Sequence, residues 1–324
     1  MLKTKLFKTA VITAALVILC AMSGWAEGLS LSLPDLDWAL KINSPGFNID
    51  SGGMRPDGLA TQAMATNKST GLVMSVFIEP AVMEGDSRAV RDYQFKGLKE
   101  SPFMDDDVVF TEDGDVALLE YFISEYQGVE LNQRHVNAYY VKDGFWIDIH
   151  LSKVKYTDAD KKLFDDVLAS VEFVDGYVQT EFDNFIYASS FYMENNYEKA
   201  AIYYEKAAAK GRAETTLPED LWRVAVDNLG MSYGISGDLQ NSERVYLAGI
   251  EQDPDYPMFY YNIACTYAEM NDKDNALSNL RKAYEKKPNM IEGEQFPDPR
   301  TDSSFQRYLA DPDFVALLDE YENK

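Results

Sequence analysis

Residues 257–288 read PMFYYNIACTYAEMNDKDNALSNLRKAYEKKP, and this stretch decides the fold of the C-terminal half. Its apolar and small residues recur at three- and four-residue spacing in two runs on either side of the polar turn 271–274, and such spacing places each run on one face of a helix. Pro288 ends the second run because proline lacks a backbone donor and clashes with the preceding turn. We therefore predict two short antiparallel helices, whose backbones approach closely at small residues such as Ala264 and Ala283.

The same pattern returns at two earlier places in the chain. Shifted back by 34 residues, Gly230 takes the place of Ala264, and Pro254 takes that of Pro288. A further copy lies 42 residues before that one, and an insertion at 215–222 accounts for the eight additional residues. The other matched positions are Tyr233, Ser242, Tyr246 and Gly249 in one copy, and Ala188, Phe191, Ala200, Tyr204 and Ala207 in the other. A fixed interval of this length is typical of helical repeat arrays.

In this spacing the C-terminal half resembles the tetratricopeptide repeat (TPR) family, whose 34-residue unit has the same small, aromatic and proline positions. The resemblance implies a solenoid of helix pairs that presents a groove to a partner. The first copy departs from the pattern, because Arg212 stands where the others have the terminal proline. The predicted all-α part consists of the helical domain 177–290, with hairpins at 181–214, 223–256 and 257–290, and a C-terminal helical cap at 291–324.

Residues 27–176 are predicted to form a separate α+β domain. Tight turns such as Asp113-Gly114 and Asp143-Gly144 join runs of alternating apolar residues, so the strands are expected to be antiparallel. The order of the elements resembles PsbP-like domains, and this resemblance implies an antiparallel sheet with packed helices but no particular chemistry. The expected strands lie at 38–42, 59–67, 72–79, 108–111, 116–126, 131–141, 145–154 and 171–174, and the expected helices at 87–99 and after Thr157.

The first 26 residues are expected to be a cleaved secretory signal peptide. Three lysines between positions 3 and 8 precede the apolar run 10–22, and the small-x-small sequence Gly24-Trp25-Ala26 follows it. The apolar run is shorter than the about 20 residues that a bilayer span needs, although an uncleaved anchor stays an alternative. We therefore expect an exported protein, periplasmic or secreted, with no integral membrane segment after cleavage.

The chain is strongly acidic, with 54 Asp and Glu against 30 Lys and Arg. Loss of the leader would remove three lysines and no acids, which changes the net charge from −24 to −27. Such a charge repels the phosphates of nucleic acids and anionic lipid surfaces, so neither is expected as a partner. Cys265 would then be the one remaining cysteine, and we expect it to pack as a small hydrophobe.

In the TPR family the first helices of the repeats line the concave surface, and the resemblance implies a corresponding groove here. Its lining is aromatic, rich in methionine and faintly acidic, which suits an apolar or basic peptide. An alternative is that part of this surface packs against the rest of the chain and binds nothing. The implied lining residues are Phe182, Phe185, Ser189, Tyr192, Met193, Val224, Asp227, Met231, Ile235, Met258, Tyr261, Cys265 and Glu269.

A second candidate site lies in the predicted antiparallel strands. A two-residue turn at Asp143-Gly144 places Tyr140 opposite Ile147 and Asn137 opposite His150, so both histidines of the chain share one face of the sheet. The cluster is compatible with a metal site or an acid/base pair, although this spacing is diagnostic of neither, and a hydrogen-bonded sheet face is the simpler interpretation. The predicted polar cluster comprises Glu120, His135, Asn137, Asp148 and His150.

The sequence contains no HExxH motif, phosphate-binding glycine loop or CxxC pair. We therefore expect a protein that is not an enzyme, binds no cofactor or metal, and mediates protein–protein interaction as an adaptor or assembly factor in the cell envelope. The alternative is an N-terminal domain that binds a ligand or metal, or is catalytic, with the repeats as its docking arm. The sequence leaves the oligomeric state open.

Overall fold

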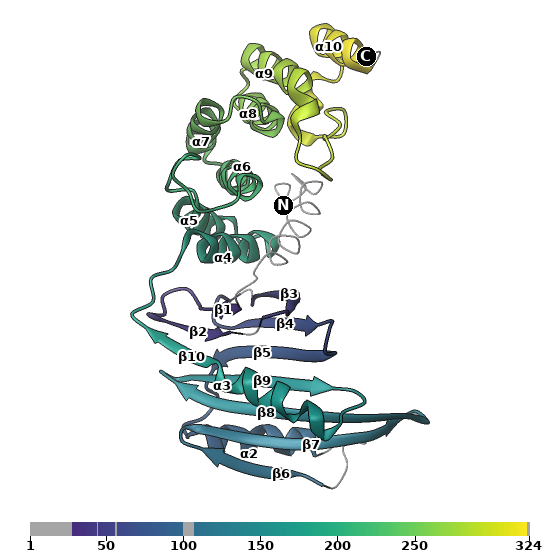
Figure 1. Cartoon of the computed structure of the whole chain (residues 1–324). Helices are drawn as coiled ribbons and strands as arrows, with labels where there is room; N and C mark the ends of the chain where they lie inside the picture. The colour runs from purple at the N-terminus through teal and green to yellow at the C-terminus, as the bar shows by residue number, and fades with distance from the viewer. Residues whose placement is uncertain (1–27, 44, 56, 100–106, 323–324) are drawn as a thin grey trace. The chain divides into compact units, whose positions relative to one another are not determined.

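The computed structural model describes residues 28–43, 45–55, 57–99 and 107–322, and the predicted signal peptide lies outside these residues. They form two compact units, one ending at Val178 and the other beginning at Gln179. The first is built on β-sheets and the second on helices (Figure 1). The expected combination of an α+β part and an all-α part is therefore confirmed. Within the described residues, no helix combines the length and the apolar character that a membrane crossing requires.

The N-terminal unit contains two antiparallel sheets, of which the smaller has the order β1-β2-β10 and the larger the order β3-β4-β5-β9-β8-β7-β6. The sequence does not predict β1 or β3, because β1 has only three residues and β3 is rich in Gly, Asn and Asp, which strands disfavour. The strands are β1 (Leu29–Leu31), β2 (Trp38–Ile42), β3 (Asn48–Met54), β4 (Thr61–Asn67), β5 (Leu72–Pro80), β6 (Val109–Asp113), β7 (Val116–Tyr126), β8 (Val129–Lys142), β9 (Phe145–Lys153) and β10 (Val171–Asp175).

A two-residue turn fixes the register between β8 and β9. Asp143 and Gly144 have positive φ angles of 48° and 80°, which is the backbone of a type I′ turn that matches the twist of the flanking strands. The register continues from this turn to Tyr140 opposite Ile147 and to Asn137 opposite His150. The predicted register is thereby confirmed, and it decides which residues share each face of the large sheet.

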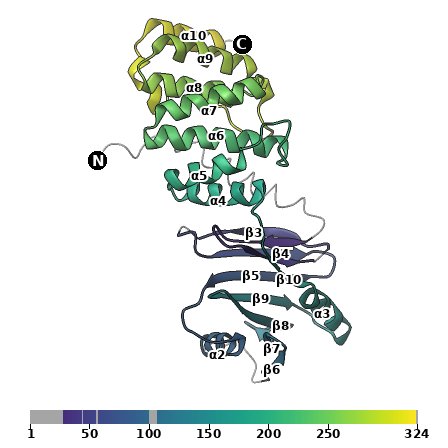
Figure 2. The ribbon, with the colours of Figure 1, turned by 90° about the vertical axis from the view of Figure 1, so that its left-hand side faces the viewer.

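The two faces of the large sheet differ in chemistry. One face of β8 and β9 is apolar and fully buried, through Val136, Ala138, Ile147, Ile149 and Leu151. On the other face α2 (Ser87–Leu98) packs over β7 and β8, where Val90 joins a cluster with Tyr121, Tyr139 and Trp146. Figure 2 shows α2 and α3 (Lys161–Ala169) on opposite sides of this sheet. The 3-10 turn η1 (Asp158–Asp160) leads into α3.

The C-terminal unit is a stack of three helix hairpins. Each helix packs on the next along the chain, and α6 also contacts the first helices of the two neighbouring hairpins (Figure 2). The hairpins are α4 (Glu181–Met193) with α5 (Tyr197–Ala207), α6 (Glu219–Ser236) with α7 (Leu239–Gln252), and α8 (Pro257–Glu269) with α9 (Lys273–Lys286). The 3-10 turns η2 (Lys287–Asn289) and η3 (Ser303–Tyr308) and the helix α10 (Pro312–Glu322) follow.

The turns inside the three hairpins share one backbone conformation. Asn195, Gly237 and Asn271 end the first helices in the left-handed region, with φ angles of 61°, 88° and 62°. The next residue in each turn caps the second helix, because its side chain accepts a hydrogen bond from a backbone N–H three residues later. These caps are Asn196, Asp238 and Asp272. Their spacings equal the shifts of 42 and 34 residues in the sequence, so the structure confirms the register of the repeats.

Close contacts between helices explain the small residues at the repeat positions. Ala264, Ala276 and Ala283 are completely buried between α8 and its neighbours. A Cβ atom at Gly249 of α7 would lie 3.1 Å from the ring of Phe259 on α8, so that position has almost no room for a side chain. The small residues that the sequence repeats are therefore the points where helices approach each other closely.

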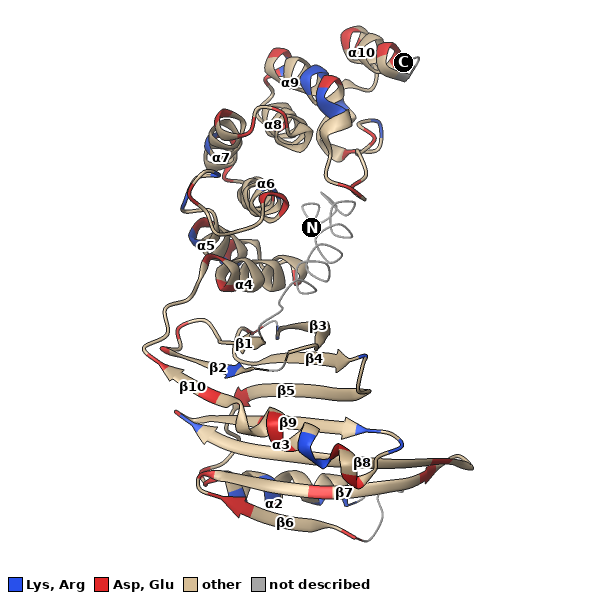
Figure 3. Ribbon diagram, viewed as in Figure 1, with Lys and Arg blue, Asp and Glu red and all other residues tan. Residues whose placement is uncertain are grey.

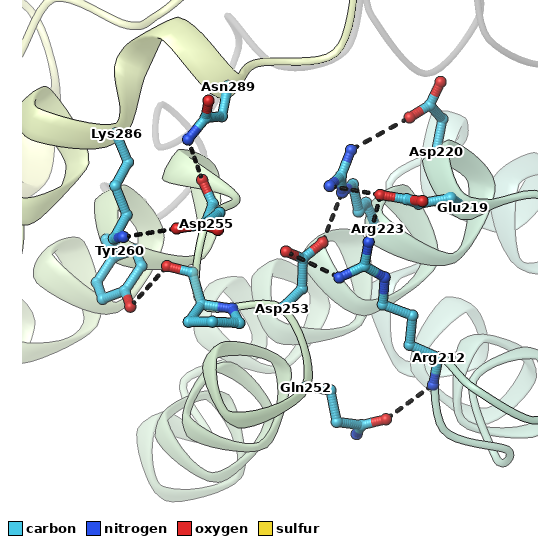
Figure 4. A network of polar contacts seen from close by, with 11 residues as sticks. Arg212, Glu219, Asp220, Arg223, Gln252, Asp253, Asp255, Tyr260, Lys286 and Asn289 are labelled. Carbon is cyan, nitrogen blue, oxygen red and sulfur yellow. Dashed lines mark hydrogen bonds and ion pairs between the residues drawn. The ribbon is translucent and has the colours of Figure 1, made fainter.

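The insertion at 215–222 is partly helical, which the sequence does not predict. Pro218 directly precedes α6, and this helix has 18 residues against 13 in each of α4 and α8. Arg212, which replaces the repeat proline, donates to Asp253 at the end of α7, with 3.2 Å between Nη1 and Oδ1. Arg223 of α6 binds the other oxygen of Asp253 at 2.7 Å (Figure 4). Glu219 of the inserted segment pairs with both arginines, so this ion-pair network links the segment to Asp253 of the second hairpin.

Candidate functional site

The predicted groove residues all lie on the first helices of the three hairpins, α4, α6 and α8. Their side chains differ in how far they are exposed. Met193 is 43% exposed, and Phe182, Ile235 and Glu269 are half-buried. The other predicted lining residues are buried, namely Phe185, Ser189, Tyr192, Val224, Asp227, Met231, Met258, Tyr261 and Cys265. Few of the implied lining residues are therefore open to a partner in this structure.

In the first hairpin, two of these residues pack against the second helix. The hydroxyl groups of Ser189 and Tyr204 are 3.0 Å apart, and the ring of Phe185 lies edge-on to that of Tyr204 at 6.1 Å. Asn228 of α6 donates to the same Tyr204 hydroxyl at 2.9 Å. Phe185 and Ser189 therefore contribute to packing between α4, α5 and α6.

A buried acid lies at the centre of the array. The carboxyl group of Asp227 accepts a hydrogen bond of 2.8 Å from the side-chain amide of Asn262 on α8. Burial raises the pKa of Asp227 to about 7, although the bond from Asn262 opposes this, and the negative charge of Glu294 raises it further. One of the two acids expected on this surface is therefore a buried carboxyl group that is only partly ionised near neutral pH.

The chain's own C-terminal segment contacts the third hairpin where a groove was expected. Tyr261 donates a hydrogen bond of 3.0 Å from its hydroxyl to Asp302 and packs edge-on against Phe296 and Phe305. The thiol of Cys265 lies 3.6 Å from the same carboxyl group. Tyr261 and Cys265 thus contact the segment that follows the repeats. The sequence predicts a covering segment here, but not that Asp302 and Phe296 reach these two residues.

A nucleophile motif in α6 lacks the structure that its chemistry needs. Gly230 to Gly234 read GMSYG and match the GxSxG pattern, in which serine sits on a sharp turn between a strand and a helix. Here the five residues lie inside α6, and Ser232 is completely buried. Both histidines of the chain belong to the other unit. The motif is therefore part of the helix packing.

The structure brings four of the five predicted polar residues together on the α2 face of the large sheet. His135 and His150 are hydrogen-bonded, with 2.9 Å between Nδ1 of the first and Nε2 of the second. Beside them, the amide of Asn137 donates to both oxygens of Asp148, at 3.0 and 3.3 Å. Tyr121 on β7 is opposite His135, and the two rings are stacked at 4.6 Å. The sequence analysis missed the role of Tyr121.

Glu120 does not belong to this cluster, so its predicted place among these five residues is wrong. Successive side chains of a strand point to opposite faces, and it is Tyr121 of β7 that lies opposite His135. Glu120 is paired with Val136 and forms an ion pair with Arg134 on the apolar face of the sheet. Arg134 in turn donates a hydrogen bond of 2.8 Å to the hydroxyl of Tyr156.

Burial shifts the pKa of each ionisable group of the cluster toward its neutral form. It lowers the pKa of His135 to about 3, with a contribution from His150, and lowers that of His150 to about 4. Burial raises the pKa of Asp148 to about 7, against the hydrogen bond from Asn137 and together with the charge of Glu79. Both imidazoles are therefore neutral at pH 7 and keep lone pairs that a cation can bind. Among the described residues, no three or more His, Cys, Asp or Glu side chains are grouped closely enough to hold a metal ion.

Comparison with known proteins supports the repeat assignment. The family model named Tetratricopeptide repeat matches residues 245–278, which run from α7 into α9. The solved structure of MamA is 19% identical and aligns with 40% of this chain and 67% of its own, with a TM-score of 0.30. YrrB, described as a TPR protein with an unusual peptide-binding site, is 23% identical over 40% of this chain and 59% of its own, with a TM-score of 0.30.

A PsbP protein is also among the similar solved structures. The solution structure of cyanobacterial PsbP (CyanoP) from Synechocystis sp. PCC 6803 is 14% identical, covers 47% of this chain and 95% of its own, and has a TM-score of 0.31. No curated protein matches the chain. The family match at 245–278 and the three hairpins in one register lead to the same conclusion. The C-terminal unit is a stack of three helix hairpins, and its segment 245–278 matches the tetratricopeptide repeat family.

Proposed function

We propose that this chain is an exported adaptor or assembly factor of the cell envelope that mediates protein–protein interaction and catalyses no reaction. The observation that carries this proposal is the TPR array itself, because stacked repeats form extended surfaces that hold proteins and peptides. The basic residues and apolar run within positions 1–26 support export, since a secretory signal peptide has this layout.

The surface of α4 and α6 is the part of the array that we assign to the partner. The segment after α9 contacts Tyr261 of the third hairpin, whereas Met193 is 43% exposed and Ile235 is half-buried on the first two. Acidic side chains outnumber basic ones over the whole chain (Figure 3), which favours a basic partner electrostatically. We therefore propose an amphipathic peptide with an apolar face and a basic face.

Two synthetic peptides that differ in one property test this assignment. Both form amphipathic helices with the same apolar face, but one carries Lys and the other Glu on its polar face, and binding to the full chain is measured by fluorescence anisotropy. We expect the Lys peptide to bind and its affinity to fall about tenfold or more, or about 1.4 kcal/mol, in Met193→Arg and in Ile235→Arg. Ile202→Arg on α5, where Ile202 is 53% exposed, is the matched control. Equal loss in the control variant, or preference for the Glu peptide, contradicts the proposed surface.

A further inference from the structure

The two histidines of the chain meet edge to edge. Nδ1 of His135 and Nε2 of His150 are 2.9 Å apart, the ring planes differ by 7°, and the ring centroids are 5.1 Å apart. If both nitrogens lie on the line that joins the ring centroids, the centroid separation equals the nitrogen–nitrogen distance plus one centroid-to-nitrogen distance in each ring. The observed separation is close to this sum. The rings are therefore nearly coplanar, and the two nitrogens point at each other across a single shared proton.

This arrangement leaves polar atoms without partners. Nε2 of His135 has no hydrogen-bond partner among the described residues, and His135 is only 7% exposed. If His135 donates the shared proton, its Nε2 is an unpaired acceptor; if His150 donates it, the Nε2–H of His135 is an unpaired donor. On the same face Asn137 Oδ1 and the hydroxyl of Tyr139 also lack partners. These atoms stay unpaired whichever ring donates the shared proton, so the cluster is not held by a complete hydrogen-bond network.

We propose that His135 and His150 bind one monovalent d10 cation, with Cu(I) as the biological ion, between their facing nitrogens, while the proton that they share moves to the other nitrogen of the ring that carries it. Lone pairs that point at each other suit two-coordinate, nearly linear geometry, and imidazole is a good ligand for copper. Metal–nitrogen bonds of about 2 Å each require the two nitrogens to separate by roughly 1 Å from their present contact. In the bound form each ring carries its proton on the other nitrogen, so Nε2 of His135 becomes an N–H group.

The surroundings favour a single charge over a double one. A structural zinc site uses four ligands, whereas the described residues hold no group of three or more His, Cys, Asp or Glu side chains that suits a metal. The cost of moving an ion out of water rises steeply with its charge, which disfavours a divalent ion against a buried ring. Asp148 lies two residues from His150 on the same face of β9 and is hydrogen-bonded to Asn137. This inference is independent of the function proposed for the repeats.

Histidine-selective 15N labelling of the full chain tests the proposal directly. The chain has only two histidines, so the NMR spectrum contains four ring-nitrogen signals. Ag(I) is the probe because it is a monovalent d10 ion that needs no reductant. We expect one equivalent of Ag(I) to shift His135 Nδ1 and His150 Nε2 together, while the other two ring nitrogens report N–H groups. Unmoved ring signals in the presence of bound Ag(I), or an equal response to Zn(II), would overturn the proposal.

Sulfur ligands are controlled with variants, since the chain also contains 12 Met and 2 Cys. Met64 lies in the same row of paired residues across the sheet as His150, and its side chain is 44% exposed. If the histidines bind the ion, Met64→Ala and Cys265→Ser should leave the shifts of the histidine ring nitrogens unchanged. His150→Ala should remove one bound equivalent of Ag(I) and the response of His135. X-ray absorption of the wild-type chain loaded with Cu(I) should show two nitrogen neighbours, and it needs no variant to fold. Sulfur neighbours in that spectrum would instead assign the ion to methionine or cysteine.

Discussion

The ring of Tyr246 occupies the space that a side chain at position 230 would need. A Cβ atom at Gly230 would lie 2.4 Å from this ring, which is far inside van der Waals contact. In the third repeat the corresponding positions are Ala264 on the first helix and Leu280 on the second, both completely buried. The second and third repeats therefore fill the corresponding space between their two helices with different residue pairs. A large residue on the second helix goes with a smaller one on the first.

Gly230→Ala should destabilise the C-terminal unit, although Gly→Ala inside a helix is ordinarily stabilising by about 1 kcal/mol. Overpacking against Tyr246 costs about 1–3 kcal/mol, so we expect a net loss in urea denaturation. Adding Tyr246→Leu reproduces the alanine–leucine pair of the third repeat and should recover part of that loss. The matched control is Gly234→Ala on the same helix, where a Cβ would lie 3.3 Å from the hydroxyl of Ser242. Stabilisation by Gly230→Ala alone contradicts this account of the contact.

Among the acids of the network in Figure 4, we expect substitution of Asp253 to lower the free energy of unfolding most. Its side chain is 2% exposed and binds both Arg212 and Arg223, so Asp253→Ala leaves two guanidinium groups without their buried partner. We expect a loss of about 3–5 kcal/mol in the free energy of unfolding. Asp255→Ala removes an ion pair with Lys286, but the Asp255 side chain is 69% exposed, and such pairs contribute about 0–1 kcal/mol. Similar losses in the two variants would show that the network does not fasten the inserted segment.

Asp302→Ala should expose the cysteine of the third repeat. Cys265 is 1% exposed, and burial and the neighbouring Asp302 hold the pKa of its thiol well above the ordinary range. Loss of the carboxyl group removes the bond from Tyr261 to the covering segment, so the segment should open more often. We expect Cys265 to react faster with a maleimide, as followed by peptide mass spectrometry. Asp298→Ala in the same segment is the control, since Asp298 is exposed and accepts its side-chain bond only locally, from Arg300; its rate should match that of the wild type.

Acid should weaken the contact between α4 and the inserted segment through Glu181. Burial alone would raise the pKa of this carboxyl group, but Lys210 and hydrogen bonds from Thr216 and Thr215 outweigh burial and hold the pKa at about 2. The folded-state pKa is therefore below the unfolded value near 4.5. The resulting stability is present above pH 4.5, is lost as the pH falls toward 2, and is on the order of 2 kcal/mol.

Glu181→Gln isolates this contribution. Urea denaturation at pH 7 should show a less stable variant, and the difference from the wild type should shrink as the pH falls below 4.5. Glu198→Gln, in the first turn of α5, is the control, and its stability difference should stay small at every pH. A Glu181→Gln difference that does not change with pH would assign the effect to packing rather than to ionisation.

The repeat register could be predicted from the sequence because helix contacts and turns act locally. Small residues such as Ala264 must recur where helices touch, and a left-handed residue such as Gly237 must end each first helix. The register of the β8–β9 hairpin was equally predictable, because the turn at Asp143-Gly144 determines every pair that follows it. In each case residues close in sequence decide the structure.

The exposure of the groove residues depends on contacts that the sequence does not encode locally. Asp302 reaches Tyr261 from 41 positions away, and nothing in the spacing of either residue indicates that contact. The sequence analysis places Glu120 on the wrong face for a different reason. The sequence does not show which residues of β7 lie opposite those of β8, and the observed register puts Tyr121 on the face of the histidines. The unpaired atoms of His135 and Asn137 become visible only when the packing around them is known.

The covering segment also limits how copies of this chain can associate. Phe305 and Phe314, which follow the third hairpin, are almost completely buried, so within the described residues these two rings are closed to the first hairpin of another molecule. An uncovered terminal repeat invites head-to-tail addition, and a heterologous contact of that kind grows into open filaments. We therefore expect the C-terminal helices to hinder polymerisation from this end, and we expect their removal to produce fibres or aggregates before it unfolds the array.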